Sequence, residues 1–234
     1  TEIIESGYTV SELADASFNA TTLTTTFVPS DLSGAYSQTE ILEAGYTATQ
    51  LKDTYTPTDL SGTYAQTEIA DAGYLLDELV DASFNASTLI NTFSVSELHD
   101  ASFSALDLSN TGVPITELKS VGFTLNELDE AGFSNTQLVD VGYTAGEMIT
   151  IDVSVPELKT LGYTALDLKN ADVSLNQIND ASYNVNELQS AGYTPTQLTG
   201  IGYGLVDFAG ISRTFSLSTW TTRYQTAYEV FDDV

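Results

Sequence analysis

A ten-residue pattern occurs twenty-one times between Thr1 and Tyr203. It reads Thr/Ser/Asn-x-x-Glu/Gln/Asp-Leu-x-x-Ala-Gly/Ser-Tyr/Phe, and residues 124–133 and 184–193 are clear copies. In a tandem array of this kind, each unit buries its apolar face only against neighbouring units. The repeat therefore restricts the chain to a solenoid-like architecture, and by itself it specifies no substrate.

Two positions of the unit are apolar throughout the array. Position 5 is always Leu, Ile or Met, and position 10 is Tyr or Phe in eighteen of the twenty-one units. Apolar residues spaced five apart fit neither a long amphipathic helix nor an alternating strand. The unit must therefore contain an element shorter than a typical helix. The aliphatic residue and the ring are the side chains that each unit is expected to bury in the core.

Each unit also carries the signals that start a helix. Position 1 is usually Thr, Ser or Asn, whose side-chain oxygen can cap the first turn. Position 4 is Glu, Asp or Gln in nineteen units, so the two positions together predict a capping box. The aromatic residue before the cap predicts a hydrophobic staple to position 5. All five prolines fall at positions 1 to 3, where a missing N–H costs nothing.

The end of the helix is marked as well. Position 9 of the ten-residue unit is Gly, Ser or Asp, which suits the left-handed residue that ends a helix. The aromatic residue after it is expected to contact the Leu of its own unit, as in a Schellman ending. Four lysines and His99 occupy position 6, in the closing turn, where a positive charge favours the helix dipole.

These signals predict an all-α solenoid with one helix of about two turns in each repeat. Helices this short are unstable alone in water, so stacking must stabilise them. Five units have nine residues, having lost one between Leu and the ring, and for them we expect a single tight turn of 3₁₀ character. They are residues 19–27, 28–36, 47–55, 56–64 and 85–93. The predicted domains are a solenoid over residues 1–203 and a C-terminal cap or docking tail over 204–234.

The run Ala-Gly-Tyr-Thr-x-x-Glu-Leu resembles tandem decapeptide repeats found in uncharacterised proteins of microbes, algae and large viruses. The likeness covers nearly all of residues 1–203, and it implies a repeat scaffold and no activity. The nine-residue units depart from it. A weaker resemblance, through Ser-Asp-Leu-Ser-Gly at residues 30–34, is to pentapeptide-repeat solenoids. It leaves a β-solenoid as the alternative fold, against which stand the charge sorting, the proline positions and the one-residue deletions.

Every aromatic residue outside position 10 lies in the C-terminal tail. Trp220, Tyr224, Tyr228 and Phe231 follow helical spacing, while Phe215 lies in a short alternating segment. The tail is expected to cap the last repeat, as solenoids require. The alternative is a docking element for another subunit, formed by these same five residues, because their number exceeds what a cap needs.

The charge of the chain excludes several partners. Its net charge is −27, from 33 acidic residues against six Lys and Arg, which repels nucleic acid and anionic membranes. No apolar run is long enough for membrane insertion. The excess of Thr, Ser, Asn and Asp over Lys indicates an exported, extracellular or cell-surface protein. Sequons at Asn19 and Asn85 allow N-glycosylation, although both residues occupy position 1, where Asn also caps a helix.

Few residues could carry catalysis. The chain has no cysteine and one histidine, which excludes the usual zinc sites, and His99 is expected on the exposed surface. No phosphate loop, dinucleotide fingerprint or nucleophile elbow is present. Periodic acids such as Glu127 and Glu130 are explained by capping, and weak Ca²⁺ binding is an alternative without a supporting motif. We therefore expect neither an enzyme nor a cofactor.

These features favour a non-enzymatic structural repeat protein, a subunit of an extracellular fibre, stalk or surface layer. Its partner would be another copy or another surface protein, since heterologous contacts that do not close produce filaments. Two alternatives stay open. One is a protein-interaction scaffold, as other solenoids are; the other is a calcium-dependent adhesin or glycan-binding module.

Overall fold

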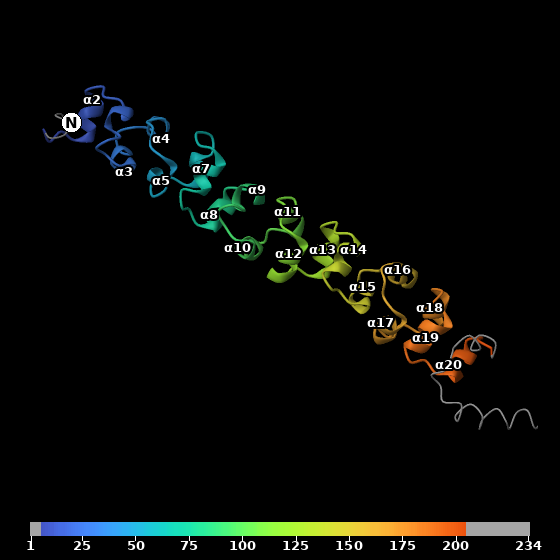
Figure 1. Ribbon diagram of the computed structural model, residues 1–234. Coiled ribbons are helices and arrows are strands. Elements are labelled where there is room, and N and C mark those ends of the chain that lie inside the picture. Colours follow the sequence, from blue (N-terminus) through green and yellow to red (C-terminus); the bar gives the residue numbers. More distant parts are fainter. Residues whose placement is uncertain (1–5, 205–234) are drawn as a thin grey trace, which may run out of the picture. The chain divides into compact units, whose positions relative to one another are not determined.

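The computed structural model describes residues 6–204, and these form short helices without any strand (Figure 1). The prediction of an all-α solenoid is confirmed, and the alternative β-solenoid is not supported. The chain divides into two compact units, residues 1–137 and 138–234. The expected cap lies outside the described residues, apart from its first residue, Gly204.

The helices follow one another at intervals of nine or ten residues. Those of the first unit are α2 (Val10–Asp15), η1 (Ala20–Leu23), α3 (Pro29–Leu32), α4 (Gln38–Leu42), α5 (Ala48–Leu51), α6 (Pro57–Leu60), α7 (Gln66–Ala70), α8 (Leu76–Asp81), α9 (Ala86–Leu89), α10 (Val95–Asp100), α11 (Ala105–Ser109), α12 (Ile115–Val121) and α13 (Leu125–Glu130). The boundary between the units falls within α14 (Asn135–Asp140). The second unit contains α15 (Ala145–Thr150), α16 (Val155–Thr160), α17 (Ala165–Asn170), α18 (Leu175–Asp180), α19 (Val185–Ser190) and α20 (Pro195–Gly200).

Most of the described helices begin with the predicted capping box. The backbone N–H of Glu127 donates to the hydroxyl of Thr124 at 3.3 Å, and its carboxylate accepts from the backbone N–H of Thr124 at 2.8 Å. Four units have an apolar residue at position 1, namely Val28, Ala65, Leu75 and Pro114. At the first three only the carboxylate half of the box forms, because an apolar side chain has no acceptor. In these three units the bond to the position 4 side chain is therefore kept where the bond to the position 1 side chain is lost. Pro114 also lacks an N–H, so neither half forms there.

The helix ends confirm the expected role of position 9. Ten-residue units place a left-handed residue there, such as Gly132 with φ +86° and Ser102 with φ +68°. In most of these units the next N–H then bonds back to the position 5 carbonyl, as from Phe133 to Leu128 at 3.2 Å. In the nine-residue units the helix is one turn of four residues, and η1 is a 3₁₀ helix. The prediction of a single tight turn is thus confirmed, with 3₁₀ character in one case.

Within each unit, stacking joins helices that lie two places apart along the chain. In the first unit one such row runs through α5, α7, α9, α11 and α13, while α4 contacts η1 and α10 contacts α12. In the second unit α15, α17 and α19 form a row and α16 contacts α18. Two repeats therefore make one turn of the solenoid. The described position 5 side chains form the centre of this stack, with exposures of 3 % or less.

Tyrosine hydroxyls connect successive turns. The hydroxyl of Tyr183 donates to the carbonyl of Tyr163 at 2.6 Å, and Tyr163 donates in the same way to Tyr143. In the first unit, Tyr64 donates to the carbonyl of Tyr46 at 2.6 Å. Burial raises the pKa of Tyr183 to about 12, because ionisation would place a charge inside the stack. Each of these three tyrosines thus contributes a ring to its own helix end and a hydrogen bond to the preceding turn.

Candidate functional site

Three hollows of the described surface recur at the same place in the repeat. One cavity of about 520 Å³ lies between α11 and α13 in the first unit. Two more lie in the second unit, of about 660 Å³ between α17 and α19 and about 470 Å³ between α15 and α17. Their lining residues correspond after a shift of 20, 40 or 60 residues, which is two, four or six ten-residue repeats. The three cavities are therefore copies of one feature of the stack.

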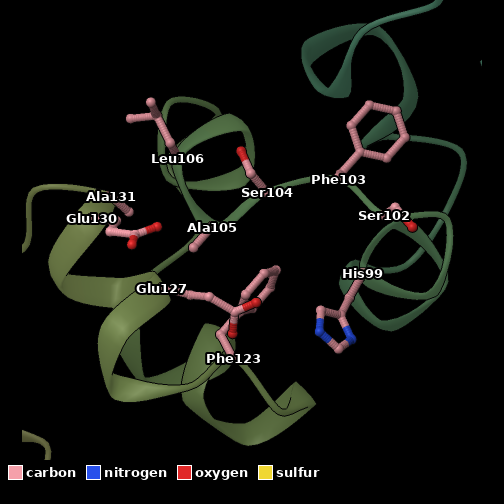
Figure 2. A pocket seen from close by; sticks show the side chains of 10 residues that line it. All are labelled: His99, Ser102, Phe103, Ser104, Ala105, Leu106, Phe123, Glu127, Glu130 and Ala131. Atoms are coloured by element: carbon pink, nitrogen blue, oxygen red, sulfur yellow. The ribbon is translucent and has the colours of Figure 1, made fainter.

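Each cavity is built from the end of one helix and the start of the next. Figure 2 shows the first one, where the imidazole of His99 and the ring of Phe123 lie beside each other with Glu127 close to the Phe123 ring. The two ring centroids are 4.4 Å apart and the ring planes meet at 67°, an edge-on contact. Nδ1 of His99 lies 3.8 Å from the carboxylate of Asp100. His99 is half-buried rather than fully exposed as expected, because its ring packs against Phe123.

A lysine takes the place of His99 in the cavity between α17 and α19. The ammonium of Lys159 donates to the carbonyl of Ser182 and lies 4.5 Å from the centre of the Tyr183 ring. It is also 3.7 Å from the carboxylate of Glu187. Lys159 therefore interacts with a carbonyl, an aromatic face and a carboxylate that all belong to the next turn.

Two further lysines also donate to a carbonyl of the next turn. Lys169 donates to the carbonyl of Ala191 at 2.9 Å and lies 4.5 Å from the ring centre of Tyr193. Lys52 donates to the carbonyl of Gly73 at 2.6 Å. The sequence placed these lysines correctly in the closing turn but missed their partner, which is the helix end one turn further on. The constant position of the lysines in the repeat indicates that they have a common partner. That partner can be identified only when it is known that two repeats make one turn.

The periodic carboxylates mainly close helices. The pKa of Glu127 is lowered by hydrogen bonds from the backbone N–H and the hydroxyl of Thr124, with a smaller effect of His99. The hydroxyl and the backbone N–H of Ser94 lower the pKa of Glu97 in the same way. Within residues 6–204, no group of three or more His, Asp or Glu side chains is arranged to hold a metal ion.

The two sequon asparagines act as helix caps. The side chain of Asn19 accepts from the backbone N–H of Thr22 at 3.1 Å, and Asn85 accepts from Thr88 at 3.0 Å. Both asparagines are exposed, and capping uses the side-chain oxygen, whereas a glycan is attached to the nitrogen. Glycosylation stays a prediction.

The predicted docking residues cannot be placed on this fold. They are Phe215, Trp220, Tyr224, Tyr228 and Phe231, which all lie beyond the part of the chain that the structure describes. In the described part, every helix is too short or too polar to cross a bilayer.

A family model described as a decapeptide repeat region matches the chain three times, over residues 63–135, 90–154 and 133–205. The matches overlap and together cover more than half of the chain. No curated protein and no solved structure matches it.

Proposed function

Because the chain belongs to the decapeptide repeat family, we propose that it is a structural repeat protein that associates with itself. In this proposal it is a non-enzymatic subunit of an extracellular fibre, stalk or surface layer. The observation that carries the proposal is the constant register between turns. The hydrogen bonds from Tyr183 to Tyr163 and from Tyr64 to Tyr46 join the same atoms in different parts of the array.

A register of this kind makes each turn complementary to a copy of itself. One side of a turn presents hydroxyl groups and the edges of position 5 and position 10 side chains, and the other side presents the carbonyls and apolar surface that receive them. Contacts of this head-to-tail type generate open filaments when the rotation between copies does not close. A second copy could therefore extend the stack with contacts that the chain already makes within itself.

The use of the acidic residues supports a non-catalytic role. Glu127 and Glu97 accept hydrogen bonds from the N-cap residues of their own helices, and these bonds lower the pKa of both carboxylates. Carboxylates held in this way stay ionised near neutral pH, so they are poor proton donors for acid–base catalysis. Their repetition in almost every unit is explained by helix closure and solubility.

The experiment is a measurement of assembly as a function of protein and salt concentration. Light scattering and negative-stain microscopy should show growing filaments, and added NaCl should promote them, because it screens the repulsion between chains of charge −27. A monodisperse monomer under all conditions would contradict self-assembly and favour the interaction scaffold. Assembly or a melting shift that requires Ca²⁺ would favour the calcium-dependent adhesin instead.

A further inference from the structure

We propose that the cavity between α15 and α17 binds a primary alkyl ammonium group, supplied by a lysine side chain of a partner protein or by a free polyamine. This binding role is separate from a structural one, and turns of the same solenoid differ in it. An ammonium group already occupies the equivalent place one turn further along. In the proposed site, by contrast, the residue at the equivalent position of the chain carries no ammonium group.

The occupied cavity defines what an ammonium group needs. The ammonium of Lys159 bonds to the carbonyl of Ser182, faces the ring of Tyr183 and lies 3.7 Å from the carboxylate of Glu187. A carbonyl, the face of an aromatic ring and a carboxylate are the groups that recognise a primary ammonium. In the repeat, the carbonyl belongs to position 9 and the ring to position 10 of one unit. The carboxylate belongs to position 4 of the unit after it.

The cavity between α15 and α17 has the same groups one turn earlier. Tyr163 and Asp167 line it and correspond to Tyr183 and Glu187 after a shift of 20 residues. Gly162 corresponds to Ser182, and the residue that corresponds to Lys159 is Val139. Valine is too short to reach the next turn and carries no charge.

The space that a base would fill is open at this turn. A Cβ atom placed on Gly73, Gly122 or Gly192 would lie between 3.5 and 3.7 Å from the lysine or histidine of the preceding turn. A Cβ atom placed on Gly162 would have nothing within 4 Å. These four glycines occupy position 9 of their units, and at Gly162 the residue that replaces the base, Val139, does not come within 4 Å of the added Cβ.

The entrance is also less crowded than in the other two cavities. Their rims carry Leu106 and Leu166, which are 47 % and 45 % exposed, whereas the third cavity has Gly146 at this position. A ligand can therefore approach the Tyr163 ring without displacing a side chain there. Asp167 gives the site a negative charge, and the net charge of −27 attracts cations to the surface.

The test is an NMR titration of tyrosine-labelled protein with two amine probes. Nα-acetyl-lysine N-methylamide represents a partner's lysine, and cadaverine represents a free polyamine. Both should shift the ring signals of Tyr163 saturably, whereas Nα-acetyl-norleucine N-methylamide, which lacks the ammonium, should not. Tighter binding of cadaverine identifies a polyamine as the ligand, and tighter binding of the lysine probe identifies a protein partner. Equal shifts with the norleucine compound, or no saturable shift, would overturn the proposal.

Two substitutions make the test specific. Val139→Lys supplies an ammonium from the chain itself and should weaken binding of both probes by about tenfold or more through direct competition. Val139→Leu is the matched control and should bind as the original chain does. Unchanged binding to a folded Val139→Lys variant would contradict the proposal.

The reverse substitution keeps the proposal testable if Val139→Lys does not fold. Lys159→Val gives the occupied cavity the short residue found at position 139, so Tyr183 should begin to respond to the probes in addition to Tyr163. A Tyr183 signal that stays unresponsive would contradict the assignment of these three groups as an ammonium site. Both substitutions leave positions 5 and 10 unchanged, so amine binding and filament formation can succeed or fail separately.

Discussion

The nine-residue and ten-residue units reach the same stacked arrangement through different helix ends. In the ten-residue unit that contains α13, the chain passes through Gly132 at φ +86° before Phe133 bonds back to Leu128. In the nine-residue unit that contains α6, Tyr64 bonds directly to the carbonyl of Leu60 at 3.0 Å. None of the five nine-residue units, all of which the structure describes, contains a residue with positive φ.

This comparison separates the essential parts of the repeat from an optional one. Both kinds of unit bury position 5, bond the position 10 N–H back to the position 5 carbonyl, and place a ring against the preceding turn. The hydroxyl of Tyr64 bonds to a carbonyl 18 residues earlier, and that of Tyr183 to one 20 residues earlier. The left-handed residue therefore acts as a spacer that can be removed, whereas the bond back to position 5 is kept.

Truncation of position 5 should have the largest effect, and it should be equal in both kinds of unit. Leu60 and Leu128 are both 0 % exposed. Replacing either with Ala removes buried methyl groups and leaves a cavity, which lowers the free energy of unfolding by about 2–5 kcal/mol. Urea unfolding followed by circular dichroism measures the loss. A much smaller effect for Leu60→Ala would show that the nine-residue units contribute less to the core than their burial indicates.

Substitution before the ring should distinguish the two kinds of unit. Gly132→Ala forces a Cβ into a left-handed conformation and should cost about 1–2 kcal/mol. No atom lies within 4 Å of the added Cβ, so the cost comes from backbone conformation alone. Thr63→Ala changes the equivalent exposed position of a nine-residue unit and should alter stability by less than about 0.5 kcal/mol. Equal losses in the two variants would refute the view that only the ten-residue unit needs a left-handed residue.

The sequence predicts the individual helix more completely than it predicts the contacts between turns. Capping boxes, left-handed residues and short turns follow from local chemistry, so Thr124, Glu127 and Gly132 take the roles expected of them. The two-repeat turn depends on how the helices pack, which a strict repeat does not encode at any single position. For this reason the contact between Lys159 and Tyr183, the tyrosine bonds and the cavities became visible only in the structure.

Removal of the tyrosine hydroxyl should have a moderate effect that does not depend on unit length. Tyr64→Phe and Tyr183→Phe each leave a backbone carbonyl of the preceding turn without its donor. The loss in the free energy of unfolding should be about 0.5–1.5 kcal/mol in each case. Thermal or urea unfolding of the two variants provides the measurement, with the folded content checked by circular dichroism. A loss confined to one variant would mean that the bond between turns differs between the two kinds of unit.

Acid should affect the two kinds of helix start differently, and this is the smallest expected effect. The nine-residue unit of α9 is capped by Asn85 and Thr88, without a carboxylate, whereas α13 relies on Glu127. Hydrogen bonds from Thr124 hold the pKa of Glu127 below its usual 4.5, so its contribution is fully present above that pH. It is lost as pH falls through the lowered folded value. Glu127→Gln should cost about a few tenths of a kcal/mol at neutral pH, because Gln keeps an acceptor but not the charge.

The measurement is an NMR pH titration of two backbone amides. The amide proton of Thr124 donates to the Glu127 carboxylate, so its chemical shift should change with a midpoint below 4.5. The amide of Asn85 has no carboxylate partner of this kind and serves as the internal control, with little change over the same range. In Glu127→Gln the Thr124 transition should disappear. If Asn85 titrated like Thr124, or if the Thr124 transition survived the substitution, the acid response would have to come from the charge of the whole chain rather than from the capping boxes.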